Sequence, residues 1–121
     1  MPSGSDEPFE TWDEVAAFAL SLPDTELSSS YGRPAVKLRG KAFVYPGREK
    51  GSFCLATPMG EKELLMETEP DTFWESAHYR GWPAVLVRYG SPSRERIEMV
   101  IERGWWDRAT KAQRQAFGPR P

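Results

Sequence analysis

The chain has 121 residues, the size of one domain, and its five Trp, six Phe and four Tyr supply enough apolar material for a packed core, which argues against a disordered protein. No apolar run is long enough to span a bilayer and no basic-then-apolar leader opens the chain, so we expect no membrane association and a cytoplasmic location. The net charge of −2 gives no overall attraction to nucleic acid, and the single Cys54 excludes an internal disulfide, as is typical of a reducing compartment.

The first predicted element is a helix that begins after Thr11 and ends before Pro23. Thr11 and Glu14 have the spacing of a capping box, and apolar residues follow at intervals of three and four. Residues 24–34 contain three Ser together with Gly and Pro, and we predict a loop there.

A three-stranded antiparallel meander is predicted for residues 34–57. Arg39-Gly40 lies between two β-prone runs, and Gly40 can adopt the positive φ that a tight hairpin requires. A longer polar loop precedes the third strand. The predicted turn places four side chains on one face of the hairpin: Val36, Leu38, Phe43 and Tyr45.

The second half of the chain predicts a short helix, two strands and a closing helix. The helix ends at Pro70, and the strands span residues 73–77 and 84–89, of which the second is apolar enough to lie in the interior of the sheet. The closing helix spans residues 90–117, with Ser93 as its N-cap and Gly104 as a point where it is expected to kink or break. Its apolar stripe is Ile97, Val100, Ile101 and Trp105.

The predicted fold class is therefore α+β with two layers: a helix, a three-stranded antiparallel meander, a helix, two strands and a C-terminal helix. We expect a disordered N-terminal tail at residues 1–10, a single domain at residues 11–112 and a C-terminal tail at residues 113–121.

Metal and nucleotide motifs are missing from the sequence. One His and one Cys give no paired ligand spacing, and neither a P-loop nor a dinucleotide-binding glycine pattern occurs. We therefore expect no metal and no cofactor.

His78 is the only histidine and the main candidate for catalysis. It precedes Gly81 and Pro83, a pattern typical of a turn that leads into a strand, so we interpret it as a structural corner at the edge of a binding surface. In the alternative, His78 is a general base beside a serine of the loop at 28–30, but no complete catalytic constellation is visible. Cys54 is interpreted as a small buried hydrophobe. We expect a protein that is not an enzyme, with these surface candidates: His78, Tyr79, Arg80 and Trp82.

Charge is distributed in alternating blocks, and residues 31–50 form the basic block, with six bases and one acid. Cations on hairpins can contact DNA phosphates, but they also keep edge strands soluble and unpaired. The candidates for nucleic-acid contact are Arg33, Lys37, Arg39, Lys41, Arg48 and Lys50. A second hypothesis is an adaptor for a protein or a small ligand, monomeric or homodimeric, that uses an aromatic surface at Trp82 or Trp105-Trp106.

Two segments, SYGRPAVKLRGK at residues 30–41 and HYRGWPAVLVR at residues 78–88, resemble the MmcQ/YjbR family of small bacterial proteins. The resemblance covers about residues 11–111. It implies a compact α+β domain, a DNA-binding label that rests on likeness to other folds, and no catalytic residues. The acidic net charge and the Trp105-Trp106 pair depart from what general nucleic-acid affinity requires. The expected function is a non-enzymatic binding domain of the MmcQ/YjbR type that binds DNA through its basic β-hairpin region.

Overall fold

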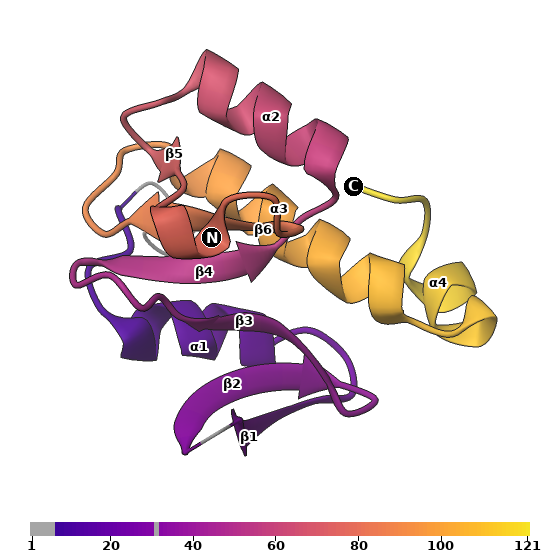
Figure 1. Cartoon of the computed structure of the whole chain (residues 1–121). Helices are drawn as coiled ribbons and strands as arrows, with labels where there is room; N and C mark the ends of the chain where they lie inside the picture. The colour runs from indigo at the N-terminus through magenta and orange to yellow at the C-terminus, as the bar shows by residue number, and fades with distance from the viewer. Residues whose placement is uncertain (1–6, 31) are drawn as a thin grey trace.

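The computed structural model describes residues 7–30 and 32–121. Six strands form one antiparallel sheet in the order β1-β2-β3-β4-β6-β5 (Figure 1). The strands are β1 (Thr25–Ser30), β2 (Arg33–Leu38), β3 (Lys41–Pro46), β4 (Ser52–Ala56), β5 (Phe73–Trp74) and β6 (Ala84–Arg88). The helices are α1 (Trp12–Leu20), α2 (Met59–Thr68), α3 (Arg94–Arg108), α4 (Lys111–Phe117) and the short 3-10 helix η1 (Ala77–Tyr79). Every helix in these residues is too short or too polar to cross a membrane.

The main core lies between one face of the sheet and the helices α1 and α3. Thr11 accepts a hydrogen bond from the backbone of Glu14 and caps α1, which confirms that part of the predicted capping box. The predicted apolar stripe of α3 is fully buried against β3 and β4. The α+β fold class predicted from the sequence is confirmed.

The segment at residues 24–34 is not a loop as predicted, because Thr25–Ser30 form strand β1. All six residues of β1 have a partner in β2, from Thr25 opposite Leu38 to Ser30 opposite Arg33. Serine has little intrinsic preference for strands, and the pairing with β2 overrides that preference. The meander consequently has four strands and begins with a polar edge strand.

The β2–β3 hairpin forms at the predicted turn but with a different register. Arg39 and Gly40 both have positive φ, 55° and 77°, as a two-residue type I′ turn requires. Val36 lies opposite Val44 instead of Phe43, because a β-bulge makes Phe43 an additional residue in β3. Tyr45 therefore lies on the opposite face of the sheet from Val36, which corrects the predicted common face.

The predicted closing helix is two helices. α3 continues through Gly104, where an added Cβ would lie 3.4 Å from the Cβ of Phe43, so the glycine allows close packing and causes no break. α4 begins after Thr110, which forms a complete capping box with Gln113. Ser93 occupies the N-cap position of α3, but its hydroxyl caps no backbone N–H and donates to Glu69 instead.

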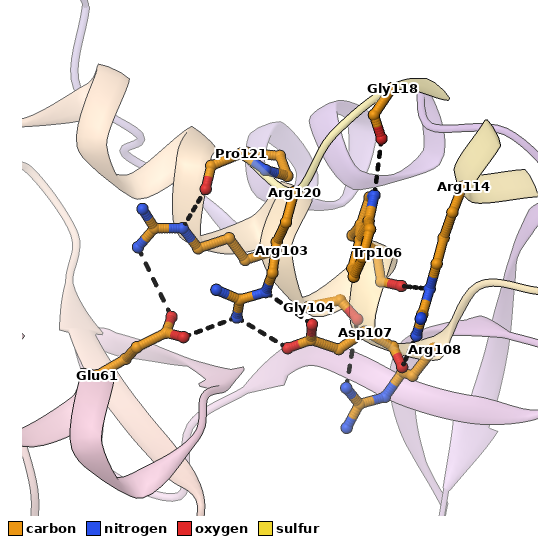
Figure 2. A network of polar contacts seen from close by, with 10 residues as sticks. All are labelled: Glu61, Arg103, Gly104, Trp106, Asp107, Arg108, Arg114, Gly118, Arg120 and Pro121. Carbon is orange, nitrogen blue, oxygen red and sulfur yellow. Dashed lines mark hydrogen bonds and ion pairs between the residues drawn. The ribbon is translucent and has the colours of Figure 1, made fainter. Parts of the chain in front are cut away.

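A network of arginines and carboxylates joins the C-terminal segment to the domain (Figure 2). Arg120 makes a two-pronged contact with Asp107, at 2.8 and 3.0 Å, and lies 2.8 Å from Glu61 of α2. Arg103 donates to the carbonyl of Pro121 at 2.7 Å and lies 3.6 Å from Glu61. Residues 113–121, predicted to be a tail, are therefore α4 and a segment bound to α2 and α3.

The N-terminal boundary also differs from the prediction. Phe9 lies in the predicted tail, yet its side chain is buried and Arg94 stacks over its ring at 3.8 Å. The rest of the predicted tail, residues 1–6, lies outside the described residues.

Candidate functional site

A pocket of about 480 Å³ opens on the face of the sheet opposite α1 and α3. Two groups of residues line it. The strand side consists of Arg33, Pro34, Ala35, Ala42, Tyr45, Pro46 and Arg48, and the other side of His78, Tyr79 and Trp82. The pocket thus joins the basic block to the segment that contains the only histidine.

Small residues on β2 and β3 leave space for the pocket. Ala35 is buried and Ala42 is half-buried, and neither side chain extends far above the sheet. Tyr45 reaches the pocket only because of the β-bulge at Phe43. The local break in strand pairing therefore shapes the site.

Lys62 of α2 fixes the wall formed by η1 and the residues after it. Its side chain is fully buried, and its ammonium group donates to the carbonyls of Tyr79 at 2.8 Å and Trp82 at 2.9 Å. The third contact is an ion pair with Glu75 at 2.8 Å. All three ammonium hydrogens are thus used inside the protein, which makes Lys62 an anchor for this wall.

Trp82 and His78 form an exposed aromatic pair at the rim. The Trp82 side chain is 60% exposed, although tryptophan is usually much more buried. The rings of His78 and Trp82 are nearly parallel, at 15°, with their centroids 6.3 Å apart. In the described residues no hydrogen bond joins His78 to Ser28 or Ser29, which lie in β1.

Arg33 and Arg48 supply the positive charge of the pocket. Arg33 donates to the carbonyl of Gly47 at 3.0 Å, and the backbone N–H of Arg48 donates to the phenol oxygen of Tyr79 at 3.2 Å. Among the described residues neither guanidinium forms an ion pair with a carboxylate. Both chain segments are held in place, and within the described part of the chain neither arginine is in an ion pair.

The other four predicted cations lie outside the pocket. Lys37 donates to the carbonyl of Ser29, and Arg39 at the hairpin turn reaches the carbonyl of Arg108. Lys41 begins β3 and does not line the pocket, although the next residue, Ala42, does. Lys50 is exposed in the β3–β4 loop. Of the six predicted cations, Arg33 and Arg48 therefore line the pocket, and the other four do not.

Arg80 and the Trp105-Trp106 pair also lie outside the pocket. The Arg80 side chain is 77% exposed and 3.8 Å from Glu75. Trp105 is fully buried and donates to the carbonyl of Pro23, and Trp106 is half-buried and donates to Gly118. Of the two aromatic surfaces predicted, Trp82 is exposed and the Trp105-Trp106 pair is not.

Polar groups beneath the pocket are in their neutral forms at physiological pH. Burial raises the pKa of the Cys54 thiol to about 11, and burial also raises the pKa of the Tyr45 and Tyr79 phenols. These groups can donate and accept hydrogen bonds, but the thiol is not ionised to act as a nucleophile. No group of three or more His, Cys, Asp or Glu side chains suited to a metal ion occurs in residues 7–30 and 32–121.

Two residues that build the site could not be identified from the sequence. The sequence pattern predicts the wrong face for Tyr45, because a β-bulge leaves no clear sequence signal. Lys62 lies in an acidic, helical segment, where a lysine is typical of a solvated surface. The available hint was that Lys62 is the only base within residues 51–78.

Three comparisons with known proteins show what this chain is similar to. A family model described as YjbR matches residues 20–106. The uncharacterized proteins Rv2570 of Mycobacterium tuberculosis and Mb2600 of Mycobacterium bovis are each 30% identical to this chain over 122 residues, which cover 88% of this chain and 95% of the relative. The crystal structure of Deinococcus radiodurans protein DR2400, with a DUF419 family-model domain, has a TM-score of 0.70 at 15% identity, covering 91% of this chain and 89% of that one. At this low identity, the similarity to the DR2400 structure shows a common fold only.

Proposed function

This chain belongs to the YjbR family, and we propose that it is a non-enzymatic binding protein whose partner is DNA. The observation that carries the proposal is the pocket in which Arg33 and Arg48, without carboxylate partners among the described residues, lie beside the exposed Trp82. Guanidinium groups match the geometry of phosphate oxygens, and aromatic faces contact bases.

The proposed contact surface is smaller than the basic block suggests. The pocket lining includes neither Lys37 and Arg39 nor Lys41 and Lys50. The pocket arginines are thus the main phosphate contacts in this proposal. Because the whole protein is acidic, local contacts supply the affinity, and general electrostatic attraction contributes little.

The two arginines provide the test. Anisotropy of a fluorescein-labelled oligonucleotide at low salt is expected to show binding that R33E/R48E weakens by at least about tenfold. R80E is the matched control, because Arg80 is equally charged and exposed on the neighbouring segment but does not line the pocket. The absence of binding at tens of micromolar protein, or an equal loss in R80E, would overturn the proposal.

The second candidate is an adaptor that binds a protein through the exposed face of Trp82. The 60% exposure of this side chain is the observation in its favour, because large exposed aromatics are typical of recognition surfaces. Sedimentation of the wild type and of W82A distinguishes this candidate when the partner is a second copy. A dimer that W82A dissociates, together with no affinity for DNA, would favour it.

A further inference from the structure

The pocket also indicates which form of DNA fits it. Bases in a duplex are stacked on one another, so their faces are covered, and a protein reads only their edges in the grooves. A base in a single strand exposes its faces and can stack on an aromatic side chain. The two forms therefore need different surfaces.

Trp82 is an exposed ring on a fixed backbone. The backbone N–H of Trp82 donates to the carbonyl of Tyr79 at 3.0 Å, and the backbone carbonyl of Trp82 accepts from the buried Lys62 at 2.9 Å. The ring lies nearly parallel to that of His78 and remains 60% exposed. A platform that is already ordered loses little conformational entropy when a base stacks on it.

The space beside this platform is suited to one nucleotide. Its volume of about 480 Å³ lies within the range of roughly 300–1,000 Å³ that is usual for small-ligand pockets. Ala35 and Ala42 leave the strand side open, and Tyr45 and Tyr79 carry neutral hydroxyl groups that can contact the polar edge of a base. A rigid duplex is too wide to place a base face in such a hollow.

Arg33 and Arg48 line the pocket from β2 and the β3–β4 loop, and Trp82 lines it from the segment after η1. Arg33 uses one N–H on Gly47 and has others left, and the guanidinium of Arg48 has no hydrogen-bond partner among the described residues. The aromatic residues that can stack on a base and the arginines that carry charge therefore line the same pocket.

We propose that this pocket binds one unstacked nucleotide of single-stranded DNA, with the base on Trp82 and His78 and the phosphate on Arg33 and Arg48. This proposal rests on the DNA binding proposed above and adds the form of the DNA. The same chemistry is present in free nucleotides and in RNA, so the experiment includes both.

The experiment compares a labelled single strand with a duplex of the same sequence, each titrated with wild-type protein over a range of salt concentrations. We expect the single strand to bind more tightly, and W82A to weaken this binding by about tenfold or more. W82F, which retains a ring face, is expected to recover part of the loss. L64A is the matched control, because Leu64 is a similarly exposed apolar side chain, at 56%, that does not line the pocket.

Salt dependence separates stacking from charge. R48A is expected to lower the slope of log affinity against log salt by about 0.7, the value of one phosphate contact with a single strand, whereas W82A is expected to leave the slope unchanged. Circular dichroism of each variant confirms that the fold is retained.

Each result decides between the two proposals. Equal affinity for single strand and duplex, with W82A unchanged and R33E/R48E weakened, would overturn the single-strand proposal and leave DNA binding in place. Tighter binding of the matching RNA, or binding of free deoxynucleoside monophosphate without binding of the strand, would assign the pocket to those ligands and overturn it as well. No binding of any nucleic acid at tens of micromolar protein would overturn the DNA proposal itself.

Discussion

Two pairs of arginines, Arg33 with Arg48 at the pocket and Arg103 with Arg120 in the C-terminal network, have the same side-chain chemistry in different surroundings. In the network, Glu61 pairs with both guanidinium groups, and Asp107 pairs with that of Arg120 (Figure 2). At the pocket no carboxylate of the described residues forms an ion pair with either arginine. The network connects helices, whereas the proposed function gives the pocket arginines a phosphate from outside as their partner.

The comparison also explains why a larger hollow is a weaker candidate. A hollow of about 680 Å³ lies along the start of α3 and contains Arg94 and Arg96. These pair with Glu98 and Glu69, both at 2.9 Å. An anion there would compete with carboxylates that are already in place. The charge available to a ligand is therefore set by pairing, and neither hollow size nor local sequence charge determines it.

The largest expected effect concerns Lys62, the paired cation on which the pocket wall depends. K62M keeps most of the side-chain volume but leaves the Glu75 carboxylate and the carbonyls of Tyr79 and Trp82 without their donor. We expect the free energy of unfolding to fall by about 3 kcal/mol and affinity for DNA to fall with it. Urea denaturation followed by circular dichroism measures the first quantity.

K50M is the control for this experiment, because Lys50 is exposed and its loss is expected to change stability by no more than about 0.5 kcal/mol. If K62M and K50M were equally stable, Lys62 would not anchor the wall, and the fixed position of Trp82 would need another explanation.

The next prediction compares one variant from each arginine pair, R120A in the network and R48A at the pocket. R120A removes the two-pronged contact with Asp107 and the pair with Glu61, and the partial exposure of these side chains limits the expected loss of stability to about 1 kcal/mol. R48A is expected to change stability by less than about 0.5 kcal/mol but to weaken DNA binding. Thermal unfolding and anisotropy on both variants measure the two effects. A loss of stability in R48A together with a loss of DNA binding in R120A would contradict the division between the two regions.

The elements that depend on local sequence could be predicted. The Thr11 cap and the Arg39-Gly40 turn follow from contacts within a few residues, and the apolar stripe of α3 follows from helical periodicity. Strand β1 could not be predicted, because its serines become a strand only by pairing with β2.

The candidate site could be predicted in part. The sequence indicates both the basic block of residues 31–50 and the residues around His78 and Trp82, but not that members of the two groups line one pocket. Whether a cation is paired depends on carboxylates distant in sequence, as for Arg120 and Glu61, and no local pattern reports such contacts. The β-bulge at Phe43, which turns Tyr45 toward the pocket, is likewise a property of the paired strands.

The smallest expected effect depends on pH and concerns Glu69, which pairs with Arg96 at the hollow along α3. Glu69 accepts from the Ser93 hydroxyl and from Arg96, and these contacts, that of Ser93 first, hold the pKa of its carboxyl below the ordinary value. A lowered pKa stabilises the fold above the unfolded-state pKa of about 4.3, and this contribution is lost as the pH falls through the folded-state pKa. S93A should therefore be less stable than the wild type by about 0.5 kcal/mol at neutral pH, and by less in acid.

Urea denaturation at neutral pH and well below pH 4 measures this difference, and S93A in an E69Q background is the control. With the carboxylate absent, the effect of S93A is expected to be small and independent of pH. A difference that stayed constant with pH in the wild-type background would mean that Ser93 acts on the start of α3 and not through the charge of Glu69. For R48A, the difference in stability from the wild type should not become smaller in acid, because Arg48 has no carboxylate partner among the described residues that could be protonated.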